Sequence, residues 1–213
     1  MVSGGKPQLD HYMSELGQVW ETDKNSFKPF PCGIVKHPAI DAAIQIHNEL
    51  KARSDVAGLV KGMRYECQVH PLVIELTSKP APRDGLEAKF SVFHGVAVGL
   101  LYGKAGPAQY SDDIARDATV IAVRDSVKAT ADPKLRSDEV IVSAVDDAGK
   151  TVSKVHVQHA VGSLEKPLDE RLLEEKFLDQ VALSLGDEAA RKASSAAWSI
   201  VESSDVSKSL ETL

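Results

Sequence analysis

The sequence has few aromatic side chains, only two cysteines and no excess of positive charge. Aromatic residues make up 5% of the 213 residues, and the formal net charge is −6. A negative net charge without a long basic run argues against a general nucleic-acid-binding protein. Cys32 and Cys67 lie far apart and match no CxxC pattern. This cysteine usage favours a reducing compartment over a disulfide-stabilised fold.

Several standard motifs are also missing. The sequence contains no Walker loop, GxGxxG, HExxH or GxSxG pattern, and so lacks the usual signatures of nucleotide binding, zinc proteolysis and serine hydrolysis. No apolar run approaches the length of a membrane span, and residues 1–10 are polar and glycine-rich, unlike a signal peptide. We therefore expect a cytoplasmic protein with no membrane partner. His156 and His159 should point to opposite faces of a strand, so we predict no metal site.

The remaining composition is that of a globular protein with a sizeable core, with 43% hydrophobic and 26% charged residues. Apolar periodicity and turn signals predict an α+β fold, in which helices flank an antiparallel sheet and further helices follow at the C-terminus. We expect helices at 9–16, 38–52, 86–102, 111–127, 169–180 and 187–202, a strand at 63–69, a strand or helical turn at 72–76, and a hairpin of 140–145 with 151–157.

A stiff, proline-rich segment at residues 27–38 is the first candidate binding element. Prolines on either side of Phe30 restrict the backbone around Lys28, and Pro38 suits the first turn of the helix that follows. A lysine held near a helix N-terminus can receive a carboxylate or a phosphate. The alternative is a surface loop whose lysines are only solvated.

His94 is the second candidate, because it lies midway along the apolar helix predicted at 86–102. A partly desolvated imidazole on such a face can exchange a proton near neutral pH. The alternative is a buried histidine that is hydrogen-bonded to a backbone carbonyl, with Lys89 and Ser91 as ordinary solvent-facing residues. His47 lies on the apolar face of the helix predicted at 38–52, where a packed core histidine is expected.

Four stretches of the sequence, in the same order, resemble motifs of the MmgE/PrpD family. They are Phe27–Cys32 (FKPFPC), His37–Ala43 (HPAIDAA), Glu87–Ser91 (EAKFS) with Val96-Ala97, and Gly162-Ser163 through Pro167-Leu168 to Lys176-Phe177. The family includes 2-methylcitrate dehydratase, cis-aconitate decarboxylase and iminodisuccinate epimerase. Its members are cofactor-independent enzymes that act on small di- and tricarboxylic acids, usually as homodimers.

The resemblance implies roles for individual residues. Lys28 matches a lysine that faces the substrate carboxylates, and His94 matches the position of an active-site tyrosine, which implies proton transfer. His37 matches a family histidine, and Lys89 and Ser91 lie within a family motif, so we expect all three at the substrate. Gly33 falls where the decarboxylase has an active-site histidine, and this departure gives no support to a decarboxylation mechanism.

The resemblance also implies an incomplete enzyme. Residues 1–168 correspond to the second, lid-like α+β domain of the family, and residues 169–213 to helices that pack on a helical domain absent from this chain. We expect a lyase (hydro-lyase) or isomerase of the family that needs no cofactor. The isolated chain should be inactive, with an exposed apolar face that is covered in a homodimer or by a separately encoded helical half. The alternative is a non-catalytic dimerisation or binding module. The sequence does not choose among dehydration, decarboxylation and epimerisation.

Overall fold

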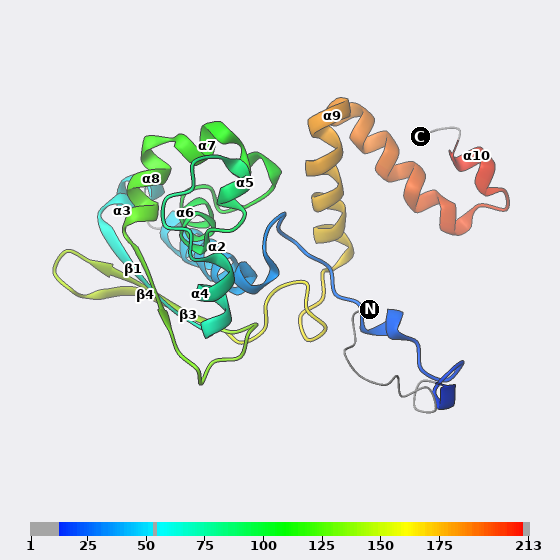
Figure 1. The fold of residues 1–213 in the computed structure, drawn as a ribbon. Helices are drawn as coiled ribbons and strands as arrows, with labels where there is room; N and C mark the ends of the chain where they lie inside the picture. The colour runs from blue at the N-terminus through cyan, green and yellow to red at the C-terminus, as the bar shows by residue number, and fades with distance from the viewer. Residues whose placement is uncertain (1–12, 53–54, 211–213) are drawn as a thin grey trace.

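The computed structural model describes residues 13–52 and 55–210, which form a body of helices and strands and a pair of C-terminal helical arms (Figure 1). The body contains a four-stranded sheet in the order β2-β1-β3-β4. Its strands are β1 (Met63–Val69), β2 (Val127–Ala131), β3 (Val140–Asp146) and β4 (Thr151–Val157). The predicted α+β class is therefore confirmed.

The sheet is mixed rather than wholly antiparallel. β1 pairs antiparallel with β3, and β3 with β4 in the predicted hairpin. β1 and β2 pair in parallel, with Tyr65 opposite Val127, so the expectation of an antiparallel sheet is wrong for this pair. Parallel strands need a crossover connection, and the helices between residues 71 and 125 supply it. Burial alternates strictly along β1, so one face of this strand meets the core and the other faces solvent.

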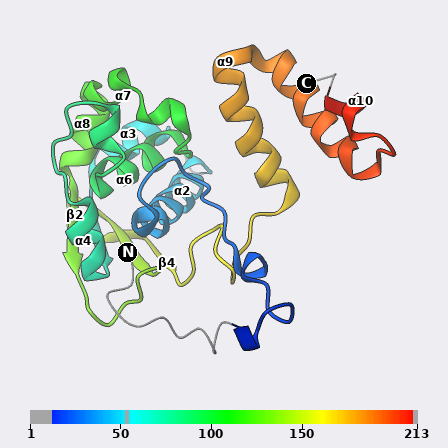
Figure 2. The ribbon, with the colours of Figure 1, turned by 45° about the vertical axis from the view of Figure 1, so that its right-hand side comes forward.

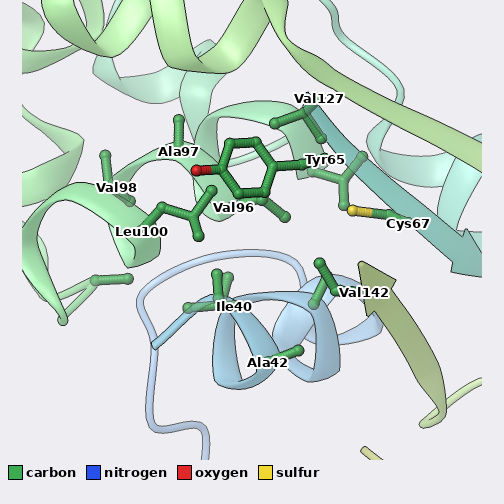
Figure 3. Packing of buried hydrophobic residues seen from close by; sticks show 14 of the residues in the cluster. Ile40, Ala42, Tyr65, Cys67, Val96, Ala97, Val98, Leu100, Val127 and Val142 are labelled. Carbon is green, nitrogen blue, oxygen red and sulfur yellow. The ribbon is translucent and has the colours of Figure 1, made fainter. Parts of the chain in front are cut away.

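The core lies between the buried face of the sheet and two long helices, α2 (His37–Lys51) and α6 (Val92–Tyr102) (Figure 3). Ile40 on α2 and Leu100 on α6 are fully buried. The two helices approach closely at Gly99, where an added Cβ would lie 2.9 Å from the Ala43 Cβ. The predicted helix at 38–52 and its apolar face are confirmed, as is the core position of His47, whose Nδ1 lies 2.8 Å from the Leu100 carbonyl oxygen.

The single helix predicted at 86–102 is wrong, because the chain breaks at residues 89–91. The two pieces are α5 (Gly85–Ala88) and α6. Ser91 adopts an extended conformation, and its hydroxyl accepts a hydrogen bond from the His94 amide at 3.1 Å. Ser91 is thus an N-cap, which starts a new helix. The predicted stop at Gly103 is confirmed by a left-handed φ of 62°.

Shorter elements complete the body. They are η1 (Glu21–Lys24), η2 (Ile34–Lys36), α3 (Val56–Lys61), α4 (Pro71–Thr77), η3 (Pro107–Tyr110), α7 (Asp112–Arg116) and α8 (Ala118–Asp125). The stretch at 72–76 is helical, and Ser111 caps α7 as predicted. Of the helix expected at 9–16, residues 9–12 lie outside the described residues.

The C-terminal part consists of α9 (Glu170–Ser199), η4 (Ile200–Glu202) and α10 (Val206–Leu210). Asp169 caps α9 as predicted, accepting from the Leu172 amide at 2.7 Å. Gly186, with φ of 80°, divides α9 into two arms. Figures 1 and 2 show the first arm beside the body and the second turned away from it. Within residues 13–52 and 55–210, every helix is too short or too polar to cross a bilayer. The division at residue 168 stays a prediction.

Candidate anion-binding site

An open pocket of about 450 Å³ lies where the proline-rich segment, the α5–α6 junction and the first arm of α9 meet. We call it the lysine pocket. Its lining consists of Lys28, Phe30, Pro31, Cys32, Gly33, Leu86, Lys89, Phe90, Lys176 and Gln180. In both ribbon views the segment leading to η2 passes between α2 and α9 (Figures 1 and 2). Lys28 comes from the proline-rich segment, Lys89 from the α5–α6 junction and Lys176 from α9. The three lysines thus belong to segments that are distant in the sequence.

Backbone hydrogen bonds hold two walls of the pocket in place. The Gly33 amide donates to the Lys89 carbonyl at 3.2 Å, which joins the proline-rich segment to the α5–α6 junction. The Phe27 amide donates to the Gly162 carbonyl at 3.0 Å. Gly162 has φ of 89°, and an added Cβ would lie within van der Waals overlap of the Phe27 carbonyl. Glycine is required there, because only glycine adopts this φ without strain.

The charge of the pocket is positive, although the whole chain is negative. None of the described residues that line it is acidic. Lys28, Lys89 and Lys176 form no ion pair with any residue in the described part of the chain. Three ammonium groups without counter-ions give a site that attracts an anion with more than one negative charge.

His94 does not line this pocket. Its side chain is fully buried, and Nε2 lies 2.9 Å from the Gln109 carbonyl oxygen. A carbonyl only accepts, so Nε2 carries the proton and Nδ1 is an acceptor, which has no hydrogen-bond partner in the structure. Burial lowers the pKa of His94 to about 4. The ring is therefore neutral at pH 7, and its unpartnered Nδ1 is a weak base.

The structure places the other predicted residues in different surroundings. Lys28 and Lys89 meet at the lysine pocket, whereas His37 and Pro38 line a separate cavity of about 180 Å³ beside Asp138. The N-terminus of α2 therefore faces that cavity. Burial lowers the pKa of His37 to about 4, and its Nε2 is unpartnered. Ser91 is buried, and its hydroxyl is used as the cap of α6.

Sequence reasoning missed a buried polar cluster between the pocket and His94. It consists of Cys32, Lys36 and Tyr110. Lys36 is fully buried, and its Nζ lies 4.9 Å from the centroid of the Tyr110 ring. The Tyr110 ring in turn lies 5.3 Å from the His94 ring. Burial raises the pKa of Cys32 and raises that of Tyr110 far above its usual range. Cys32 alone of this cluster reaches the pocket.

One side-chain group in the described part of the chain has the composition of a metal site. Ligand atoms of Asp138, His159 and Glu165 lie within 4.8 Å of one another. Arg136 already occupies this group, since its Nε donates to Asp138 at 3.3 Å. His159 Nδ1 lies 2.9 Å from the same carboxylate. The arrangement is an ion-pair network in which the Arg136 guanidinium takes the place that a metal cation would need. Its positive charge opposes metal binding there.

The comparisons with known proteins give the family of this chain. Residues 30–200 match the model of the MmgE/PrpD C-terminal domain. The chain therefore belongs to the MmgE/PrpD family, as the motifs indicated.

Among similar proteins, the 2-methylcitrate dehydratase of Escherichia coli K12 is 24% identical over 110 residues. The 2-methylcitrate dehydratase of Cupriavidus necator is 30% identical over 118 residues. Each match covers 51% of this chain and 22% of the relative. The chain therefore corresponds to a minor part of these enzymes.

Proposed function

We propose that this chain is the carboxylate-binding part of an MmgE/PrpD-type lyase or isomerase that acts on small di- and tricarboxylic acids, as a 2-methylcitrate dehydratase does. The lysine pocket holds the substrate carboxylates, with Lys28 and Lys89 on the body and Lys176 on the arm. A helical partner, or a second copy of the chain, supplies the rest of the active site. The reaction needs no cofactor, and the protein works in the cytoplasm.

The observation that carries this proposal is the pocket of about 450 Å³ lined by three lysines and no acidic residue among those described. Such a pocket suits a compact polyanion. An ammonium group beside a substrate carboxylate also stabilises the negative charge that develops when a proton leaves the neighbouring carbon. Substrate binding and the stabilisation of developing negative charge therefore depend on the same ammonium groups.

His94 is the proton-transfer group in this proposal. Its Nδ1 has no hydrogen-bond partner, and its side chain is fully buried and does not line the lysine pocket. Burial lowers the pKa of His94 to about 4, which keeps the ring neutral at pH 7 but makes it a weak base, so the proton-transfer role rests on the family motif rather than on the basicity of this ring. Positioned acid–base groups of this kind contribute ~10²–10⁴-fold to a rate. His37 and Ser91 take no direct part in the proposal, since they lie away from the lysine pocket.

Isothermal titration of the purified chain with citrate tests the binding step. Lys28→Ala and Lys89→Ala should each weaken binding ~10-fold, as expected for loss of a charge-assisted hydrogen bond. The matched control is Lys128→Ala, which removes an exposed lysine on β2 outside the pocket and should leave affinity unchanged. Equal affinities of all four proteins would refute the pocket assignment. In the completed enzyme, Lys28→Ala should abolish most turnover while the fold stays intact.

A second candidate function is assembly, and the arms are the observation that favours it. Leu185, Trp198 and Val201 are 62%, 44% and 84% exposed. Exposed apolar side chains at this density are typical of a surface that binds another protein. A chain that self-associates through the arms but binds no citrate would be a dimerisation module instead. Light scattering together with the citrate titration separates the two functions.

A further inference from the structure

Lys36 is a buried lysine for which ordinary packing gives no explanation. It belongs to η2, its side chain is fully buried, and no carboxylate among the described residues pairs with it. Removing an ammonium group from water without an opposite charge costs several kcal/mol. A methionine would fill a similar volume without that cost.

The hydrogen bonds of Lys36 do not explain why a lysine is buried at this position either. Its Nζ donates to the carbonyls of Ala88 at 3.0 Å and Ser91 at 2.8 Å. Both carbonyls already accept a backbone hydrogen bond, from the amides of Ser91 and Gly95 respectively. Neither acceptor would be left unsatisfied without the lysine. The ammonium group is therefore not required for the backbone hydrogen bonding of this region.

Lys36 joins the two walls of the lysine pocket, since it belongs to the proline-rich segment and its ammonium group bonds to the α5–α6 junction. Its acceptors are the last residue of α5 and the cap of α6, which flank Lys89 and Phe90. The Gly33 amide, in the same segment as Lys36, donates a hydrogen bond to the carbonyl of Lys89, which lies between these two acceptors in the sequence. The ammonium thus lies against the wall that carries Lys89, close enough to Cys32, which lines the pocket, to act on the pKa of its thiol.

We propose that Lys36 is a positioning residue of the lysine pocket, which fixes the Lys89–Phe90 wall and places a fourth positive charge under the bound anion. This inference rests on the proposed function, because it assigns Lys36 a part in binding the same polycarboxylate. It also gives the buried charge a use: desolvation makes an ammonium act over a longer range than an exposed one. The site then attracts a tricarboxylate more strongly than its three surface lysines alone would allow.

The charge of Lys36 can be followed by pH without any mutation. Burial lowers the pKa of Lys36 to about 8. Cys32 and Tyr110 face it from the proline-rich segment and η3, and burial raises the pKa of both. His37 and His94 face it from α2 and α6 and are neutral above pH 7, since burial lowers the pKa of each to about 4. Lys89 belongs to the junction whose Ala88 and Ser91 carbonyls accept from Lys36. Citrate affinity of the wild-type chain should therefore fall as pH rises through about 8.

The test is titration of citrate into the wild-type chain and the Lys36→Met, Lys36→Arg and Lys28→Ala variants between pH 6.5 and 9. Lys36→Met should bind citrate ~10-fold more weakly at pH 7 and should lose the change in affinity near pH 8. Lys36→Arg should recover part of the affinity. Hydrogen exchange of residues 86–95 without ligand gives a second readout, and exchange should be faster in Lys36→Met.

The outcomes separate this inference from the proposed function. If Lys28→Ala weakens binding while Lys36→Met matches wild type in affinity, pH dependence and exchange, the pocket stands and the role of Lys36 is wrong. If the wild-type chain binds no citrate, the proposed function fails and the role of Lys36 in anion binding fails with it. A lower melting temperature of Lys36→Met with unchanged affinity would show a purely structural lysine and would overturn the inference.

Discussion

The body and the C-terminal arms bury very different shares of their apolar side chains. In the body, β1, α2 and α6 each present a continuous apolar face to one core. In α9, by contrast, the buried residues are Ala190 and Ser194, while Leu183, Leu185 and Trp198 are 61%, 62% and 44% exposed. The body therefore buries its own apolar faces, whereas the arms leave apolar side chains exposed, which is typical of a surface that binds another protein. The lysine pocket lies where the two regions meet.

The largest effect of a single substitution should come from adding one methyl group in the body. At Gly85 an added Cβ would overlap the Tyr110 carbonyl, and backbone atoms cannot move aside cheaply. Gly85→Ala should lower the free energy of unfolding by about 3 kcal/mol or more, measured by urea denaturation. Gly62→Ala is the matched control, because its nearest neighbour would lie 3.8 Å away, and it should be nearly neutral. Equal stability of the two variants would contradict the packing described for the body.

Acid should destabilise the body and spare the arms. Burial lowers the pKa of His37 and His94 to about 4, from about 6.5 in the unfolded chain. Above pH 6.5 both rings are neutral in both states. Between pH 6.5 and 4 only the unfolded state takes up the protons, so stability falls with pH by roughly 3 kcal/mol per histidine.

Denaturation at pH 4.5 to 7.5 checks this dependence, and His94→Asn should reduce its slope. Residues 170–202 contain no histidine. The helix content of the arms should therefore not follow the same titration. A body whose stability is constant from pH 7 to pH 5 would show that these histidines are not buried neutral.

The Lys176→Ala variant tests whether the first arm contributes to the lysine pocket. It lines the lysine pocket from the first arm of α9. Lys176→Ala should weaken citrate binding ~10-fold, about as much as Lys28→Ala does, because each removes one ammonium group from the same anion. Lys192→Ala is the control in the second arm, where Lys192 pairs with Glu188 at 2.9 Å. If both arm variants bind like wild type, the pocket belongs to the body alone.

The smallest effect on stability should follow substitution of exposed leucines in the arms. Leu183 and Leu185 are 61% and 62% exposed, so the double change to serine should alter the stability of the body by less than about 0.5 kcal/mol. Light scattering should show weaker self-association, or weaker binding to a co-expressed helical half. A loss of several degrees in the melting temperature of the body would mean that the arms support it after all.

Much of the body could be predicted from the sequence, because its elements carry strong local signals. The alternation of Tyr65, Cys67 and Val69 defines β1, and the caps at Ser111 and Asp169 start helices as expected. β2 was missed, since Val127 is its one buried residue and its pairing depends on a distant strand. The break at residues 89–91 was missed because the apolar period continues across it. Ser91, a favoured N-cap before an apolar run, was the signal that could have revealed it.

The candidate site could be predicted only in part. The prolines around Lys28 and the family motif at Lys89 indicated two of the three pocket lysines. Lys36 was not found, because a lysine between apolar residues is usually exposed and only the three-dimensional contacts reveal its burial. Lys176 was not found because its place depends on how the first arm meets the body. Local patterns locate residues on elements, whereas a binding pocket depends on how elements converge.

Chemical-shift mapping of the ¹⁵N-labelled chain with citrate tests the central claim most directly. The account predicts that saturable shifts gather at the amides of Gly33, Lys89, Phe90 and Gln180, all of which line the lysine pocket, and that they disappear in the Lys28→Ala variant. Shifts confined to other surfaces, or no shifts at millimolar citrate, would contradict it.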